Sequence, residues 1–188
     1  MAEYWDFESA EAFATGAIGQ PGERTFYLQI RADGRTLSVK CEKTQVAELS
    51  RHMRGMLSDL PDVGSADSAS AWLTSPVEQD FVLGSIGLGI DRASSRMVIQ
   101  LEEMQVFDED DLDLDDETDD ADIAAALESL LEDDENELSS TVVRVLLTAA
   151  QAKAFCDVAD SVVMAGREPC RWCGAPKETS GHACPRMN

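Results

Sequence analysis

The first third of the chain alternates hydrophobic and polar residues, which is the pattern of strands that bury one face. Over 24–32 one face is hydrophobic, and the other carries Gln29 and Arg31. Asp33 and Gly34 follow and predict a hairpin turn, because both residues tolerate a positive φ. The hydrophobic face of the two strands consists of Phe26, Leu28, Ile30, Leu37, Val39 and Cys41.

Two later segments change to the period of amphipathic helices. The first helix is expected over about 44–61. The second begins at Thr148, which forms a capping box with Gln151, and is expected to end at Gly166. The inward residues are Val46, Leu49, Met53, Met56, Leu57 and Leu60 in the first helix, and Phe155, Val158, Val162 and Ala165 in the second.

A second hairpin is expected between these helices, with strands over 81–90 and 97–101. The hydrophobic positions of its first strand change parity near Gly84, which predicts a β-bulge there. A dense hydrophobic run over 142–147 predicts a central strand. Together these elements predict an α+β domain, in which an antiparallel sheet has two helices packed on one face.

The two helical regions also show a weak internal sequence similarity. Residues 37–49 and 143–155 both run from a strand through a turn and a glutamine into a helix. The match is too short to establish a duplication, but it supports the α+β assignment.

Changes of composition divide the chain. Residues 1–166 are expected to form the α+β domain, with a linker-like loop over 61–76 that is rich in small and polar residues. An acidic insertion over 107–138 interrupts the same domain. Residues 167–188 are expected to form a small zinc-knuckle tail.

The net charge of −22 comes mainly from one segment. There is no Lys or Arg between Arg96 and Arg144, whereas the segment 102–137 contains 19 acidic residues, so the rest of the chain is close to neutral. Such a run repels itself and stays solvated, as an acidic surface loop does. The other interpretation is a docking segment for a basic partner.

A short amphipathic stretch lies inside the acidic insertion. Asp122 suits a helix N-cap, and hydrophobic residues follow it at helical spacing. This helix could dock in a partner's groove or fold back on its own domain. Its hydrophobic residues are Ile123, Leu127, Leu130 and Leu131.

A glycine-rich loop precedes the first long strand. Gly16, Gly19 and Gly22 suit turn positions with a positive φ, and this is the simpler interpretation. A ligand-binding loop that also uses Gln20 and Arg24 is the alternative, because function often lies on such loops.

The C-terminal tail has the spacing of a metal site. Cys170 and Cys173 form a C-x-x-C turn, and His182 and Cys184 follow after a stretch that contains glycine and proline. Three thiolates and one imidazole complete a closed tetrahedral site, which predicts structural Zn²⁺. A redox dithiol and an iron–sulfur cluster are weaker alternatives, because the pair follows a helix and the cluster lacks a fourth cysteine. Trp172, between the first two ligands, is a candidate partner contact.

The cysteine content and the lengths of the hydrophobic runs indicate the cellular compartment of the protein. Five cysteines, three of them near the C-terminus, fit a reducing compartment better than a disulfide framework. No hydrophobic run has the length of a membrane span, and the first residues do not have the pattern of a secretory signal. A cytoplasmic protein that does not use a membrane is expected.

The motifs of the loop and the tail together resemble the domain of unknown function 3090 family of actinobacterial proteins. The resemblance extends over most of the expected domain and is most specific in the cysteine motif. It implies an actinobacterial cytoplasmic protein and no particular activity. The residues that carry it lie in 16–26, 42–46, 166–176 and 181–188.

Three classes of function compete. A non-catalytic interaction or adaptor module with a protein partner is favoured, because the metal site is closed, no catalytic set can be assembled and the charge is segregated. A nucleic-acid-associated protein is the second, since basic residues gather over 23–54, but the overall negative charge opposes it. An enzyme with a site around Arg24, Glu42 and Lys43 is the third.

Overall fold

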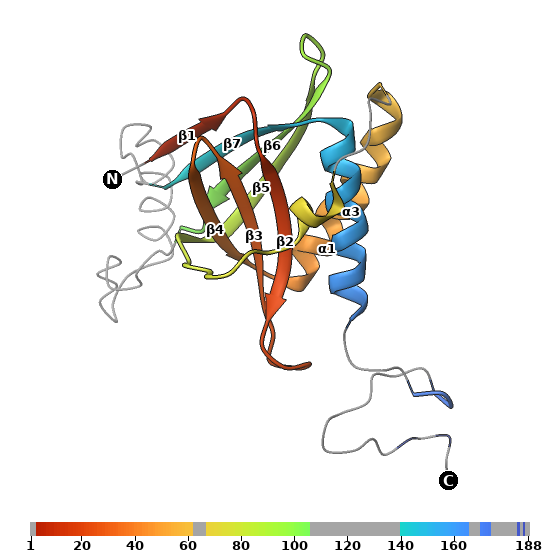
Figure 1. Cartoon of the computed structure of the whole chain (residues 1–188). Coiled ribbons are helices and arrows are strands. Elements are labelled where there is room, and N and C mark those ends of the chain that lie inside the picture. The colour runs from red at the N-terminus through yellow and green to blue at the C-terminus, as the bar shows by residue number, and fades with distance from the viewer. Residues whose placement is uncertain are drawn as a thin grey trace, which may run out of the picture.

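The computed structural model of the protein describes residues 3–61, 67–105, 140–165, 170–173, 184 and 186. In these residues the fold is α+β, with a seven-stranded, mostly antiparallel sheet and two α-helices on one side of it, which confirms the expected class (Figure 1). The elements are β1 (Tyr4–Phe7), β2 (Ala12–Ile18), β3 (Thr25–Ala32), β4 (Arg35–Cys41), α1 (Lys43–Met56), η1 (Leu57–Asp59), η2 (Ser68–Ala71), β5 (Phe81–Asp91), β6 (Arg96–Glu103), β7 (Val142–Leu147) and α3 (Ala149–Met164).

The sheet has the strand order β1-β7-β6-β5-β4-β3-β2. Neighbouring strands are antiparallel except for β1 with β7 and β4 with β5. In Figure 1 the sheet is strongly curved, so that β2, β3 and β4 lie in front of β5, β6 and β7. Its two outer strands, β1 and β2, are consecutive in the chain and are joined by residues 8–11.

The predicted hairpin turn at Asp33 and Gly34 and the predicted bulge are confirmed. Asp33 has a φ of 53° and Gly34 a φ of 72°, and both lie in the tight turn between β3 and β4. The register of β5 with β6 shifts between Leu83 and Ile86, which places the β-bulge at the predicted position. The first helix is shorter than expected, because after Met56 the chain tightens into the 3-10 turn η1.

The fold consists of two units with the same order of elements. The first half is β2, β3, β4 and α1, and the second half is β5, β6, β7 and α3. The last strand of each half runs parallel to the strand that leads into the other half: Val39 of β4 pairs with Phe81, and Val145 of β7 pairs with Phe7. The weak similarity in the sequence therefore corresponds to a repeated structural unit of three strands and a helix. In the first half, the two strands β1 and β2 together are equivalent to the single long strand β5 of the second half.

Equivalent glutamines join the two halves. The backbone N–H of Glu42 donates to Gln45 Oε1 at 2.8 Å, and Gln45 Nε2 donates across the sheet to the carbonyl of Gly84 at 3.2 Å. This carbonyl lies in the interruption that the β-bulge makes in β5. One side chain thus completes the capping box of α1 and satisfies a carbonyl that the sheet leaves unpaired.

The second half repeats this arrangement. The backbone N–H of Thr148 donates to Gln151 Oε1 at 3.0 Å, and Gln151 Nε2 donates to the carbonyl of Ala10 at 2.7 Å. Ala10 lies in the break between β1 and β2, which is the counterpart of the bulge in β5. Each helix is therefore anchored to the irregular point of the other half's first strand.

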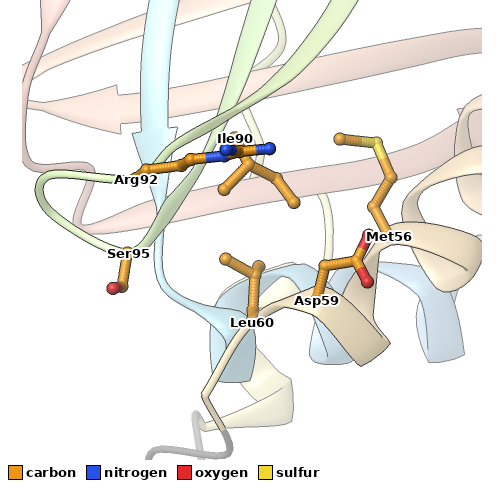
Figure 2. Close-up of a pocket in the computed structure, with 6 residues that line it drawn as sticks. All are labelled: Met56, Asp59, Leu60, Ile90, Arg92 and Ser95. Carbon is orange, nitrogen blue, oxygen red and sulfur yellow. The ribbon is translucent and has the colours of Figure 1, made fainter.

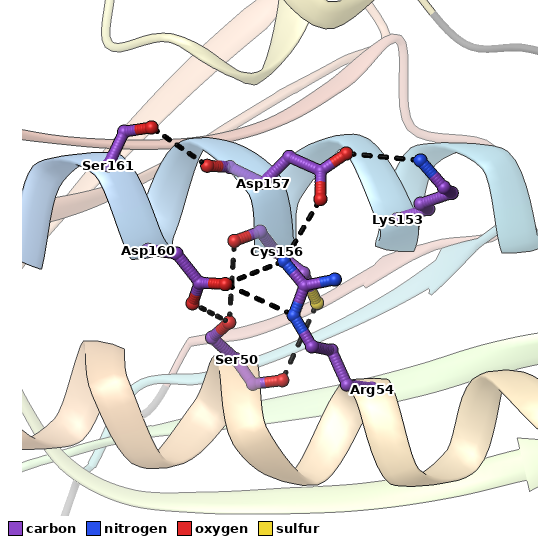
Figure 3. Close-up of polar contacts among 7 residues, drawn as sticks. All are labelled: Ser50, Arg54, Lys153, Cys156, Asp157, Asp160 and Ser161. Atoms are coloured by element: carbon purple, nitrogen blue, oxygen red, sulfur yellow. Dashed lines mark hydrogen bonds and ion pairs between the residues drawn. The ribbon is translucent and has the colours of Figure 1, made fainter.

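The two helices pack against each other through a polar cluster (Figure 3). Ser50 Oγ donates to Asp160 Oδ1 at 2.9 Å, and Arg54 Nη2 contacts both Asp157 at 2.9 Å and Asp160 at 2.6 Å. The hydrogen bond from Arg54 holds the pKa of the Asp157 carboxyl below its usual value. Cys156 Sγ lies beneath this cluster and donates to the carbonyl of Ser50 at 3.5 Å, so it is a buried thiol, as expected.

The core lies between the helices and the sheet. The rings of Phe13 in β2 and Phe155 in α3 have centroids 4.6 Å apart, and both side chains are fully buried. Burial raises the pKa of Cys41 to about 12, which makes it an unreactive core thiol at neutral pH.

Part of the segment expected to be linker-like packs on the sheet. Leu73 N donates to the carbonyl of Thr15, which covers the outer edge of β2. Gln29 and Thr74 exchange two hydrogen bonds, Gln29 Nε2 to the Thr74 carbonyl at 3.1 Å and Thr74 N to Gln29 Oε1 at 3.0 Å. Gln29 is consequently 0% exposed, although it lies on the face of β3 opposite the hydrophobic residues.

Candidate metal centre

Three cysteines converge beyond the end of α3. The sulfur atoms of Cys170, Cys173 and Cys184 all lie within 4.8 Å of one another, and those of Cys170 and Cys184 are 3.7 Å apart. Four thiolate ligands about 2.3 Å from a zinc ion would lie about 3.8 Å from one another. The cluster therefore has the dimensions of a tetrahedral thiolate site and could hold a metal ion.

Backbone hydrogen bonds stabilise the thiolate form of Cys170. Residues 171–173 form a turn, and the backbone N–H groups of Cys173 and Trp172 donate to the sulfur of Cys170. These donors lower the pKa of Cys170 to about 6. Desolvation raises the pKa of Cys184 instead, so Cys170 is the first of these two thiols to ionise.

The predicted fourth ligand, His182, lies outside the described residues, as does Gly166, the expected end of α3. A set of three thiolates favours soft or borderline metals over Mg²⁺ and Ca²⁺, which prefer oxygen ligands. The imidazole of His182 stays the predicted group that would close the site.

Trp172 lies on the surface next to the cysteines. Its side chain is 51% exposed, and the guanidinium of Arg171 lies 5.0 Å from the centroid of its ring. Arg186 Nη1 donates to the carbonyl of Trp172 at 3.2 Å, which links the turn to the chain after Cys184. The cluster thus carries an exposed aromatic ring with cationic groups beside it.

The close approach of another segment explains the first glycine of the candidate ligand loop. The prediction that Gly16 occupies a turn with a positive φ is wrong: Gly16 lies in the strand β2, where a Cβ atom would come within 2.6 Å of the Cβ of Leu73. The absence of a side chain therefore lets residues 67–76 pack against the sheet.

The backbone conformation explains why Gly19 and Gly22 are glycines. Gly19 has a φ of 110° and Gly22 a φ of 106°, as the turn interpretation predicts. Glu23 N donates to the carbonyl of Gln20 and closes the turn. None of Gly19, Gln20, Gly22 and Arg24 lines either of the two hollows described below. A ligand role for this loop stays a prediction.

The remaining candidate residues belong to the predicted partner-binding helix and to the predicted enzyme site. Ile123, Leu127, Leu130 and Leu131, with the whole acidic insertion, lie outside the described residues. Glu42 is the N-cap of α1, and neither it nor Lys43 lines either of the two hollows described below.

Sequence reasoning missed two hollows. One of about 680 Å³ lies between the end of α1 and the β5–β6 hairpin. The other, of about 320 Å³, is lined mainly by polar residues of β3, β4 and 74–80. Each hollow is formed by residues far apart in the chain, so no local motif marked them.

The fold and the cluster define an α+β protein with three cysteines near its C-terminus that could together hold a metal ion. The profile of the family described as protein of unknown function (DUF3090) matches residues 5–184, a range that contains all three cysteines of the cluster. The chain therefore belongs to the DUF3090 family. Searches of curated proteins and of solved structures found no match. Among the described residues, no helix has the length and hydrophobicity needed to cross a membrane.

Proposed function

We propose that the tail binds one structural zinc ion and that the protein is a non-catalytic, cytoplasmic interaction module. The ligands in this proposal are Cys170, Cys173, Cys184 and His182. The observation that carries it is the convergence of three sulfur atoms within 4.8 Å of one another. A closed site of this kind leaves no coordination position for a substrate and instead holds the chain in place.

Zinc fits the donor set better than the alternatives. Three thiolates and one imidazole form a common structural zinc set, and zinc requires no redox chemistry of its protein. An iron–sulfur cluster would require further cysteine ligands. None of the five cysteines, all of which the structure describes, forms a disulfide bond, which supports a reducing compartment such as the cytoplasm.

Two features of the chain support the interaction role. The first is the exposed Trp172 with the Arg171 guanidinium beside it, a combination that is common in the energetic centre of interfaces. The metal would fix the turn that presents this ring. The second is the acidic insertion over 107–138, which suits a basic surface on a protein partner.

Crosslinking in cells followed by mass spectrometry tests this proposal. A specific partner should be lost or strongly weakened in Trp172→Ala or after deletion of residues 107–138. Trp72→Ala is the matched control, because Trp72 is 49% exposed but lies on the body of the protein. A partner set unchanged by both alterations would contradict the interaction role and leave the metal proposal standing.

Nucleic-acid binding is the second candidate function. A guanidinium next to an exposed aromatic ring can stack on single-stranded bases, and the acidic insertion would then compete for that surface. A deletion variant without residues 107–138 should bind single-stranded oligonucleotides with an affinity that falls as salt rises. Absence of such salt-dependent binding would rule out this second function.

A further inference from the structure

A hollow of about 680 Å³ lies between the C-terminal end of α1 and the β5–β6 hairpin (Figure 2). This volume falls within the range of about 300–1,000 Å³ that is typical of small-molecule sites. Its lining residues are Met56, Asp59, Leu60, Ile90, Arg92 and Ser95.

Half of the lining is hydrophobic. Leu60 is buried, while Met56 and Ile90 are half-buried and pack against the edge of the core. Figure 2 shows Leu60 rising from the 3-10 turn, with Ile90 across the hollow and Met56 at its side. These three side chains offer a surface on which a hydrophobic group of a ligand would lose its contact with water.

The side chains of the two charged residues of the lining have no partner among the described residues. Asp59 lies in the 3-10 turn η1 that follows α1, and Arg92 lies across the hollow in the β5–β6 hairpin (Figure 2). Across residues 3–61, 67–105 and 140–165, neither side chain makes a hydrogen bond or an ion pair. By contrast, Arg54 and Arg144 are bound to carboxylates in the same part of the chain.

We infer that this hollow binds a small zwitterion with a hydrophobic body, that is, a hydrophobic amino acid or a short hydrophobic peptide. The ligand's carboxylate would pair with the guanidinium of Arg92, whose planar donors suit a carboxylate. Its ammonium group would pair with the carboxylate of Asp59. Its side chain would cover the surface of Met56, Leu60 and Ile90.

The opposite signs of the two walls make this ligand class specific. A simple hydrophobic anion would satisfy Arg92 but bring its charge towards Asp59, and a hydrophobic amine would do the reverse. A hydrophilic amino acid would satisfy both charges and leave the hydrophobic surface exposed to water. The combination of both charges with a hydrophobic body is the arrangement that satisfies all three parts of the site.

This site shares no residue with the cysteine cluster, so the inference goes beyond the proposed function and does not depend on it. Loss of metal binding would leave the hollow unaffected. Conversely, failure of ligand binding would leave the metal proposal unaffected.

Titration of the full-length protein, followed by calorimetry or by NMR, tests the inference. The probes are L-phenylalanine, L-leucine and the dipeptide of two leucines, which together distinguish an amino acid from a short peptide. The matched probes are 3-phenylpropanoate, which lacks the ammonium group, and phenethylamine, which lacks the carboxylate. A zwitterionic probe should bind at least about tenfold more tightly than either matched probe, as expected when one charged contact is lost.

Three variants assign this binding to the hollow. Arg92→Gln should weaken zwitterion binding about tenfold and remove the advantage of L-phenylalanine over phenethylamine. Asp59→Asn should likewise remove its advantage over 3-phenylpropanoate. Arg51→Gln is the control, because Arg51 is exposed on α1 and does not line the hollow, and this variant should bind as the wild type does.

Two results would overturn the inference. The first is no binding of any zwitterionic probe up to about 10 mM, which is weaker than the millimolar range of small-ligand sites. The second is binding that Arg92→Gln and Asp59→Asn leave unchanged while circular dichroism shows both variants folded.

Discussion

The two halves of the fold have the same order of elements but are extended in different places. In the first half, β3 and β4 meet in a tight turn at Asp33 and Gly34, whereas in the second half 104–141 separate β6 from β7. After α1 the chain returns to cover β2 through 67–76, whereas after α3 it leads to the cysteine cluster. The shared elements build the sheet and the core, and the cysteine cluster lies where the halves differ.

The thiols give the largest expected contrast between the two halves. Cys41 lies in β4 with its pKa raised to about 12, and Cys170 lies beyond α3 with its pKa lowered to about 6. In reduced, metal-free protein at pH 7, iodoacetamide should modify Cys170 more than about 100-fold faster than Cys41, because the thiolate is the reactive form. Peptide mass mapping over time measures both rates. Similar rates would show that the core around Cys41 opens readily.

Equivalent core positions on the two helices should respond alike. Leu49 of α1 and Phe155 of α3 are both buried at matching places in the repeat. We expect Phe155→Ala to lower the free energy of unfolding by about 3–5 kcal/mol and Leu49→Ala by about 2–5 kcal/mol, because each leaves a cavity. Urea unfolding should stay a single transition in both variants. A biphasic curve for either would show that the halves unfold independently.

The equivalent glutamines should show a smaller and matched effect. Gln45→Ala and Gln151→Ala each remove a capping-box partner and a hydrogen bond to the other half. Each variant should lose about 1–2 kcal/mol of stability. Gln20→Ala, in an exposed turn, is the control and should change stability by less than about 0.5 kcal/mol. A large effect at one glutamine alone would break the equivalence of the halves.

Of the features compared, the ion pairs between the two helices should contribute least to the free energy of unfolding. The side chains of Arg54 and Asp157 are 40% and 50% exposed, so Arg54→Met should cost only about 0.2–1 kcal/mol. Arg54 lowers the pKa of Asp157 below its usual 3.8, so this contribution is present above that value and is lost as the pH falls through the lower folded value. Wild type and variant should therefore differ in stability at pH 7 and converge as the pH falls below 3.8. An equal difference at pH 7 and at low pH would mean that Arg54 acts through packing.

Local patterns predicted the elements, because each pattern depends on neighbours in the chain. Alternation placed β3, the Asp33–Gly34 turn and the bulge near Gly84, and all three are confirmed. The capping residues Thr148 and Gln151 placed the start of α3. The spacing of Cys170, Cys173 and Cys184 predicted that they come together.

Long-range packing could not be predicted in the same way. Gln29 is buried on the face opposite the hydrophobic residues because residues 67–76 cover it, and the composition of that segment gave no sign of packing. The hollow between α1 and the β5–β6 hairpin depends on Asp59 and Arg92, which are distant in sequence and belong to no motif. Such sites arise only when the tertiary structure brings separate segments together.

The metal content of the protein tests the central claim most directly. Protein purified under reducing conditions should carry one zinc ion per chain, with sulfur ligands at about 2.3 Å and one nitrogen ligand at about 2.0–2.1 Å by X-ray absorption. Cys173→Ser should lose the metal while its main unfolding transition stays in place, because the core of the body does not include the tail ligands Cys173 and Cys184. Wild-type protein without stoichiometric metal under these conditions, or collapse of the whole fold in Cys173→Ser, would contradict the account.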